Sequence, residues 1–237
     1  MALPKINHPT FSLELISNGK TIRYKPFTVK EEKILLVAQS SEDRQQIVDA
    51  IRQVISNCVI DTDFDVDKIS SFDMEYIFIN LRSKSVNNIV DIVLRDNEDG
   101  KDYNFQINLD EIKVVKKENH SKKIQITDDL GVIMRYPNYR ESNLFLTEED
   151  TDQVTVMLKM ISKCIDVVYQ GERLYKVEED FTEEEALQFV NDLPLDSTDK
   201  FREFFDNFPE IEYVIEYKNS LGNDRSYKLN GISSFFL

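Results

Sequence analysis

Apolar and polar residues alternate along several short segments of the chain, which is the pattern of β-strands with one buried face. Turn-forming residues such as Asn, Asp and Gly separate the members of each pair of segments, and this arrangement predicts antiparallel hairpins. The predicted hairpins are 11–16 with 21–27, 89–94 with 103–109, and 211–217 with 225–231. Shorter strand-like pieces occupy 112–115, 124–126 and 132–136.

Apolar residues that recur every three or four positions predict helices between these strands. Thr28 stands three residues before Glu31, which is the spacing of a capping box, so we expect a helix to begin there. Acidic residues at 147–150 begin a longer periodic stretch, which predicts one helix reaching to about Tyr169. Further helices are expected at 47–55, at 72–81, from Thr182 and from Ser197, the last with an aromatic stripe interpreted as core: Phe201, Phe204, Phe205 and Phe208.

These elements indicate an α+β fold in which helices alternate with antiparallel β-hairpins. A helix, a shorter helix and a hairpin follow one another in both halves, and Ile55-Ser-Asn-Cys58 in the first matches Ile161-Ser-Lys-Cys164 in the second. Two organisations stay open, namely two similar helix-hairpin modules or independent units. We expect three regions: 1–115 with the N-terminal hairpin, helices and second hairpin, 116–146 as a strand-rich connector, and 147–237 with the C-terminal helices and final hairpin.

Composition narrows the classes of partner. The chain has 237 residues, enough for a buried core, and 44 acidic against 29 basic side chains give it a formal net charge of -15. This charge repels the phosphate backbone, so we expect no nucleic-acid partner. No stretch has the roughly 18 apolar residues of a membrane span and no signal peptide is visible, so we expect no membrane association and a reducing, cytoplasmic environment. Cys58 and Cys164 lie in apolar runs and are expected to be buried free thiols.

Sequence motifs of catalysis or ligand binding are missing. Nucleophilic triads need an imidazole, but His8 and His120 lie in predicted loops outside any motif. The aspartates of 61–67 have the spacing of a calcium loop, but the central glycine is missing and residue 72 is Phe where that loop ends in Glu. No zinc-type ligand pair and no glycine-rich phosphate loop occurs. We therefore expect no enzyme activity, no catalytic residue, no cofactor and no metal.

Several short segments carry a resemblance when taken together. The central one is Tyr24-Lys-Pro-Phe-Thr-Val-Lys-Glu-Glu-Lys-Ile-Leu-Leu-Val-Ala38, and the others are Met-Ala-Leu-Pro-Lys-Ile6, Leu81-Arg-Ser-Lys-Ser-Val86, Phe204-Phe205 and the ending Gly-Ile-Ser-Ser-Phe-Phe. In these segments the chain resembles the baseplate hub or hub-assembly family of T-even-like contractile-tail bacteriophages. Members of that family often carry cysteine pairs in the two later hairpins. Here the corresponding turns, 96–100 and 219–224, contain no cysteine, so turn residues must close them without zinc.

The resemblance implies a non-enzymatic protein that acts in assembly of the baseplate hub, either as a retained subunit or as an assembly factor or chaperone. It implies other baseplate hub proteins as partners, and the host cytoplasm and the virion tail baseplate as locations; the oligomeric state stays open. Candidate partner contacts are the apolar chain end, Phe235, Phe236 and Leu237, together with Tyr24 and Phe27. The chain end has docking into the protein's own core as an alternative.

Two further functions remain open at this stage. One is an acidic decoy that occupies a host nucleic-acid-binding protein by imitating phosphate charge. The other is an enzyme whose catalytic residues are dispersed along the chain, which would require a cleft holding titratable groups with shifted pKa values.

Overall fold

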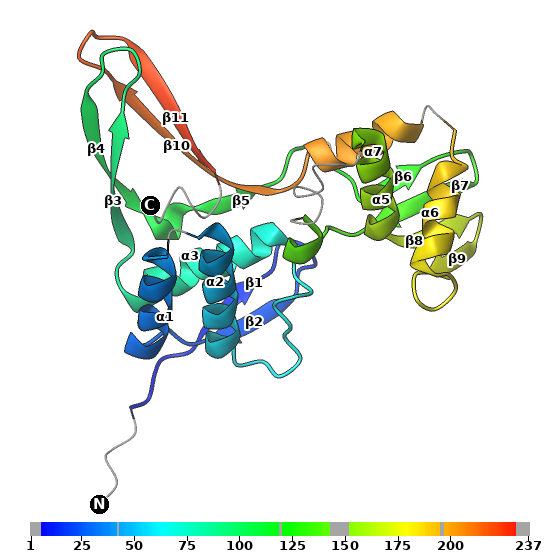
Figure 1. Ribbon diagram of the computed structural model, residues 1–237, viewed down its shortest axis with the longest axis horizontal. Helices are drawn as coiled ribbons and strands as arrows, with labels where there is room; N and C mark the ends of the chain where they lie inside the picture. Colours follow the sequence, from blue (N-terminus) through cyan, green and yellow to red (C-terminus); the bar gives the residue numbers. More distant parts are fainter. Residues whose placement is uncertain (1–5, 42, 119, 143–151, 195–196, 231–237) are drawn as a thin grey trace, which may run out of the picture. The chain divides into compact units, whose positions relative to one another are not determined.

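The computed structural model describes residues 6–41, 43–118, 120–142, 152–194 and 197–230. Helices alternate with antiparallel strands along this part of the chain, so the predicted α+β class is confirmed. The chain divides into two units, which can be followed along the sequence colours of Figure 1. Unit 1 comprises the described residues of Met1–Lys68, Phe72–Val115 and Glu210–Leu237, and unit 2 those of Ile69–Ser71 and Lys116–Pro209.

These units differ from the three regions expected from the sequence. The strands of the expected connector, 116–146, belong to a sheet of unit 2, whereas the final hairpin belongs to unit 1. Long-range strand pairing is the reason, because 113–115 pairs with 210–212 across most of the second half of the chain. Alternation along a strand indicates that one face is buried, but it does not indicate which strand lies alongside.

The first part of unit 1 is a hairpin followed by three helices. Its elements are β1 (Phe11–Glu14), β2 (Thr21–Tyr24), α1 (Val29–Gln39), α2 (Arg44–Cys58) and α3 (Ser71–Ser85), the last belonging to unit 1 from Phe72. Helix α1 begins at the predicted capping box, where the Glu31 carboxylate accepts hydrogen bonds from Thr28 N at 3.0 Å and from Thr28 Oγ1 at 2.6 Å. Helix α3 lies at the centre of this part, with Ile77, Ile79 and Leu81 completely buried.

The acidic segment 61–67 is a loop whose carboxylates pair with cations instead of converging on a common point. Asp61 accepts from Arg23 at 2.7 Å, Asp63 pairs with Lys20 at 2.5 Å, and Asp67 pairs with Arg52 of α2. Among the described residues, no group of three or more His, Cys, Asp or Glu side chains is arranged to hold a metal ion. The calcium-loop spacing in the sequence therefore corresponds to three separate ion pairs.

The second part of unit 1 consists of two hairpins that pack face to face (Figure 1). One is β3 (Ile89–Arg95) with β4 (Asp102–Asn108), and the other is β10 (Glu210–Lys218) with β11 (Asp224–Asn230), to which β5 (Lys113–Val115) adds along β10. Their inner faces share one apolar cluster with α3 and with the short helix η1 (Leu109–Glu111): Ile79, Leu94, Ile107, Leu109, Ile112, Ile211, Ile215 and Leu229. The second and third predicted hairpins are thus confirmed, and they form a common core.

The described residues of unit 2 contain a four-stranded antiparallel sheet, three helices with described bounds and a helical turn at 139–142. The strands, in spatial order, are β6 (Lys123–Gln125), β7 (Leu130–Met134), β8 (Ile165–Gln170) and β9 (Arg173–Lys176), and the helices are α5 (Gln153–Cys164), α6 (Glu183–Asn191) and α7 (Ser197–Asp206). In Figure 1 the helices gather on this sheet. None of the helices described in either unit is long and apolar enough to cross a membrane.

The helix predicted to reach Tyr169 is wrong in its second part. Helix α5 ends at Cys164, and residues 165–170 form strand β8 between β7 and β9. β-branched residues such as Ile165 and Val167 favour a strand once neighbouring strands are available for pairing, and apolar periodicity over a short run does not separate the two states. The hairpin β8–β9 also separates α5 from α6, so the order of parts that suggested two similar modules is interrupted.

Both cysteines are buried free thiols, as predicted, and burial raises the pKa of each to about 12.

His120 lies in a loop, as predicted, but its ring also stacks on Phe204 with centroids 5.2 Å apart, and its Nε2 lies 2.8 Å from the Tyr136 hydroxyl. No sequence pattern predicts this contact, because the partners of His120 lie 16 and 84 positions away.

Candidate functional site: the paired hairpin tips

The turns of the two face-to-face hairpins are closed by glycine. In β3–β4, Gly100 N donates to Asp96 O at 2.9 Å, and Gly100 has a φ of 70°. In β10–β11, Gly222 N donates to Asn219 O at 3.0 Å, and Gly222 has a φ of 86°. Glycine adopts this left-handed conformation without the steric cost that a Cβ brings. Ordinary turn chemistry therefore closes both tips, as the absence of cysteine in these turns predicts.

Asp96 joins the two tips from the inside. Its side chain is completely buried, and its Oδ2 accepts hydrogen bonds from the Tyr217 hydroxyl at 2.5 Å and from Arg225 Nε at 2.9 Å. Its Oδ1 accepts from Glu98 N at 2.7 Å. The hydrogen bond from Tyr217, with smaller contributions from Glu98 N and Arg225, holds the pKa of Asp96 below its usual value even though burial opposes this. A buried carboxylate with charged and hydroxyl donors fixes both hairpins in one arrangement.

A second acid, Asp99, ties the tips together at the surface. Its Oδ2 accepts from the Tyr103 hydroxyl at 2.6 Å, from Ser220 Oγ at 2.8 Å and from Ser220 N at 3.0 Å. These bonds, led by the one from Tyr103, keep the pKa of Asp99 far below its usual value. The carboxylate is therefore ionised under all physiological conditions and remains an acceptor for the opposite turn.

Glu98 completes the contact between the turns. One carboxylate oxygen accepts from Asn219 Nδ2 at 2.6 Å and the other from Asn223 Nδ2 at 2.7 Å. We call the whole set the tip network: Asp96, Glu98, Asp99, Tyr103, Tyr217, Asn219, Ser220, Asn223 and Arg225. It connects residues about half the chain apart, with sequence separations of 117 to 129.

Tyr217 links the tip network to the apolar core of the hairpins. Its ring lies 5.0 Å from that of Tyr103 and 5.2 Å from that of Phe105, measured between centroids, while its hydroxyl donates to Asp96. An amphipathic ring of this kind packs apolar surface at one end and satisfies a buried acceptor at the other. The pair of hairpins is therefore cross-linked both by packing along its length and by polar contacts at its end.

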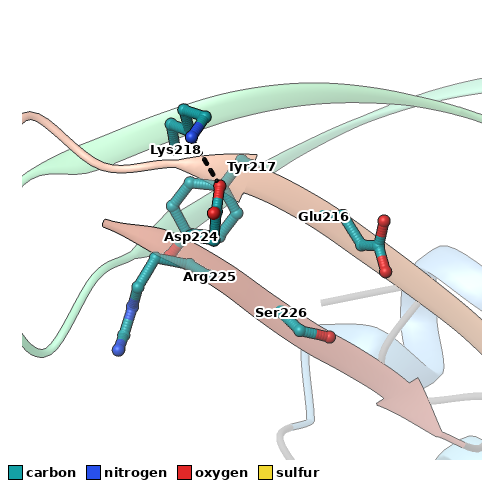
Figure 2. Close-up of a pocket in the computed structure, with 6 residues that line it drawn as sticks. All are labelled: Glu216, Tyr217, Lys218, Asp224, Arg225 and Ser226. Carbon is teal, nitrogen blue, oxygen red and sulfur yellow. Dashed lines mark ion pairs between the residues drawn. The ribbon is translucent and has the colours of Figure 1, made fainter. Parts of the chain in front are cut away.

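A shallow pocket of about 460 Å³ lies at the end of β10–β11 (Figure 2). It is lined by Glu216, Tyr217, Lys218, Asp224, Arg225 and Ser226, and Lys218 pairs with Asp224 at 2.9 Å across it. The lining carries both signs of charge and hydrogen-bonding groups. Such a lining can form polar contacts with another chain.

The hairpins also present backbone and apolar groups to solvent. In the described sheet, β11 has β10 on one side and no strand on the other, so its outer edge offers N–H and C=O groups for an added strand. Val93 on β3 and Val214 on β10 have 61% and 43% of their surface exposed and point away from the shared core. An open strand edge and exposed apolar side chains are each features of protein-binding surfaces; here the edge belongs to β11, and the valines lie on the outer faces of the two hairpins.

The candidate contacts named from the sequence lie elsewhere. Tyr24 and Phe27 are 2% and 8% exposed in the core of unit 1, so a partner could reach these rings only if that segment opened. Burial, aided by the charge of Asp110, raises the pKa of Tyr24 to about 12. The chain end 235–237 lies outside the described residues.

Sequence reasoning missed the tip network. The signal available was the density of acidic and amide residues in two separate turns, 96–100 and 219–224, which turn chemistry already explains. Only the folded chain brings these turns together.

A comparison with known proteins gives one match. A family model described as T4 bacteriophage base plate protein matches residues 8–237, which includes all the described strands and helices of both units. Searches of curated proteins and of solved structures give no significant match. The family relationship therefore applies to the whole architecture, including the paired hairpins.

Proposed function

Because the chain belongs to the T4 bacteriophage base plate protein family, we propose that it acts in the hub of the tail baseplate by binding other hub proteins. Membership of the family makes it a phage baseplate protein. Its position in the hub and the identity of its partners are parts of the proposal. So is its mode of action, either as a subunit retained in the particle or as an assembly factor that works in the host cytoplasm and then leaves.

The observation that carries the proposal is the pair of hairpins that the tip network and the shared core hold together. The tip network holds the end of the pair and the shared core holds its length, so β11 keeps an open edge in a fixed geometry. Binding to a preformed surface costs less ordering entropy than binding to a flexible one, which favours stable association with a partner. The outward-facing Val93 and Val214 supply apolar contacts on either hairpin.

A non-catalytic role is part of the same proposal. Strongly shifted pKa values in a cleft would favour an active site, but those at the tips arise from hydrogen bonds among the acids, tyrosines and arginine of the network itself. These groups are used in holding the two hairpins together, which accounts for their shifted pKa values without a substrate.

Co-purification tests the proposed contact surface. An affinity-tagged full chain is expressed with the other hub proteins of the same phage, and we expect recovery of at least one of them at fixed stoichiometry. The variants Val93→Asp and Val214→Asp are expected to reduce this recovery at least about fivefold, because a charge in an apolar contact carries a desolvation cost. Val29→Asp on α1 is the matched control, since Val29 is 81% exposed and belongs to no hairpin. Equal recovery of all three variants would refute the hairpin surface.

Mass spectrometry of purified virions and of infected-cell extract separates the two modes of action. A retained subunit is present in the particle at a constant ratio to known baseplate proteins. An assembly factor is abundant in the extract and depleted from the particle.

A further inference from the structure

Unit 2 contains a second concave surface, away from the hairpins in sequence. Its cavity of about 230 Å³ is formed by the loop before β6, by β6 itself and by α7. The residues used below are His120, Lys123, Gln125, Lys200, Glu203 and Phe204. All of them belong to unit 2, so the cavity is complete within one unit.

One wall of this cavity is held rigidly by aromatic packing. The ring of His120 stacks on Phe204 at 5.2 Å and on Tyr136 at 5.5 Å between centroids, and Tyr136 and Phe204 lie 5.9 Å apart. The rings are thus occupied with one another. They give this wall of the cavity a fixed shape.

Three lysines at or near the cavity form no ion pair among the described residues. Lys200 Nζ donates to Gln125 O at 2.8 Å, and Lys123 Nζ lies 4.7 Å above the ring of Tyr169. Nearby, Lys117 Nζ donates to Asp206 O at 2.7 Å. Their partners are a carbonyl, a ring and a carbonyl, and within the described ranges none of these three lysines forms an ion pair.

Some lysines elsewhere in the chain form ion pairs with acidic side chains. Lys84 pairs with Asp110 at 2.7 Å, and Lys163 with Glu183 at 3.0 Å. What distinguishes Lys123 and Lys200 is their position, since both line the same cavity and neither forms an ion pair with a described acidic side chain, in a protein whose formal net charge is -15.

The pKa of His120 also reflects positive charges near the cavity. Burial lowers the pKa of His120, and the charges of Lys116 and Lys122 lower it further. A positive potential in this part of unit 2 thus acts on a group that belongs to the cavity. Glu203, next to Phe204 on α7, is the acidic residue of the lining.

We propose that this cavity, hereafter the basic pocket, binds an acidic segment of a partner protein, with Lys123 and Lys200 contacting its carboxylates. The chain's net charge of -15 favours this partner over a nucleic acid, whose long phosphate backbone would be repelled by the rest of the surface. A short acidic peptide segment contacts the basic pocket alone and avoids that repulsion. The proposal rests on the proposed function in taking the partner to be a protein, and it adds a second contact with defined chemistry.

The test uses the full chain and a fluorescein-labelled peptide of about eight glutamates, followed by fluorescence anisotropy at about 50 mM salt. We expect saturable binding that weakens at about 300 mM salt, because the attraction between exposed charges is screened. The variant Lys123→Glu/Lys200→Glu is expected to weaken binding at least about tenfold, and Lys123→Gln/Lys200→Gln by a smaller factor, since the latter removes attraction without adding repulsion.

Lys33→Glu/Lys68→Glu is the matched control. Both residues are exposed lysines of unit 1, and the variant changes the net charge by the same amount. We expect it to change the affinity less than about twofold. Equal weakening by the control would show that net charge alone attracts the peptide and would overturn the proposal, as would tighter binding of a single-stranded oligonucleotide than of the peptide. Circular dichroism of each variant confirms that the fold is retained.

The peptide assay contains no baseplate protein, so its outcome is separate from the co-purification assay. Absence of peptide binding overturns the basic pocket and leaves the proposed hub function standing. Peptide binding without co-purification of any hub protein would support the basic pocket and overturn the proposed hub function.

Discussion

Replacing Ile107 with alanine tests whether the two later hairpins share one core. Ile107 lies on β4 with 1% of its surface exposed, within the cluster that also contains Ile211 and Ile215 of β10. If the hairpins stabilise each other, the substitution leaves a cavity at their interface that neither can fill. The strands cannot close around it, because the ladders on both sides and the tip network fix their separation.

The expected loss of stability follows from this geometry. A buried Ile→Ala change removes transfer free energy and leaves a cavity, at a cost of about 2 to 5 kcal/mol, and Ile→Val costs about 1 kcal/mol. We expect Ile107→Ala to cost about 3 kcal/mol. Val93→Ala on β3 is the control, since that side chain is 61% exposed on the outer face, and we expect a cost of about 0.5 kcal/mol or less.

Urea unfolding followed by circular dichroism gives the change in free energy, and hydrogen exchange with mass spectrometry locates it. We expect protection to fall in both hairpins together, including β10, although the substitution lies on β4. Equal costs for Ile107→Ala and Val93→Ala would refute the shared core. Loss of protection confined to β3–β4 would show that the hairpins are stable independently.

Three further outcomes follow from the structure. The lowered pKa of Asp96 means that its stabilisation is complete above about pH 4 and is lost as the pH falls through the folded-state value, so the urea midpoint should decline in acid, and less so in Asp96→Asn. Gly131→Ala should lower the melting temperature measured by calorimetry, because the new Cβ would lie 2.6 Å from Ile124 O and clash with the Tyr169 hydroxyl. Cys58 and Cys164 should resist an aqueous thiol reagent until urea unfolds the chain, because burial raises the pKa of both to about 12.

Local sequence patterns predicted most of the elements and few of their partners. The hairpins and the beginning of α1 follow from alternation, turn residues and a capping box, all of which act within a few positions. Strand β8 was predicted as helix because its pairing with β7, some thirty-five positions earlier, decides its state. Residues 210–230 likewise belong to unit 1 because of contacts with segments far away in the sequence.

The candidate site was less predictable than the fold. Asp96 reads as an ordinary turn residue, and nothing in its neighbourhood indicates that Tyr217 and Arg225 will donate to its carboxylate. Lys117 and Lys123 lie in or next to a segment interpreted as a polar loop, and the absence of an ion pair at either, among the described residues, appears only when the positions of acidic side chains are known. Functional surfaces of this kind depend on relations between distant segments, which a single sequence does not record.

The discontinuity of unit 1 has a consequence for synthesis on the ribosome. Strands β3 and β4 emerge early, but the strands that cover their apolar side, β10 and β11, are translated only after all of 116–209. During that interval the nascent chain exposes Leu94 and Ile107, and it is prone to aggregation or capture by chaperones. Any translation product that stops before residue 210 would lack β10 and β11, and the apolar side of β3 and β4 would stay exposed.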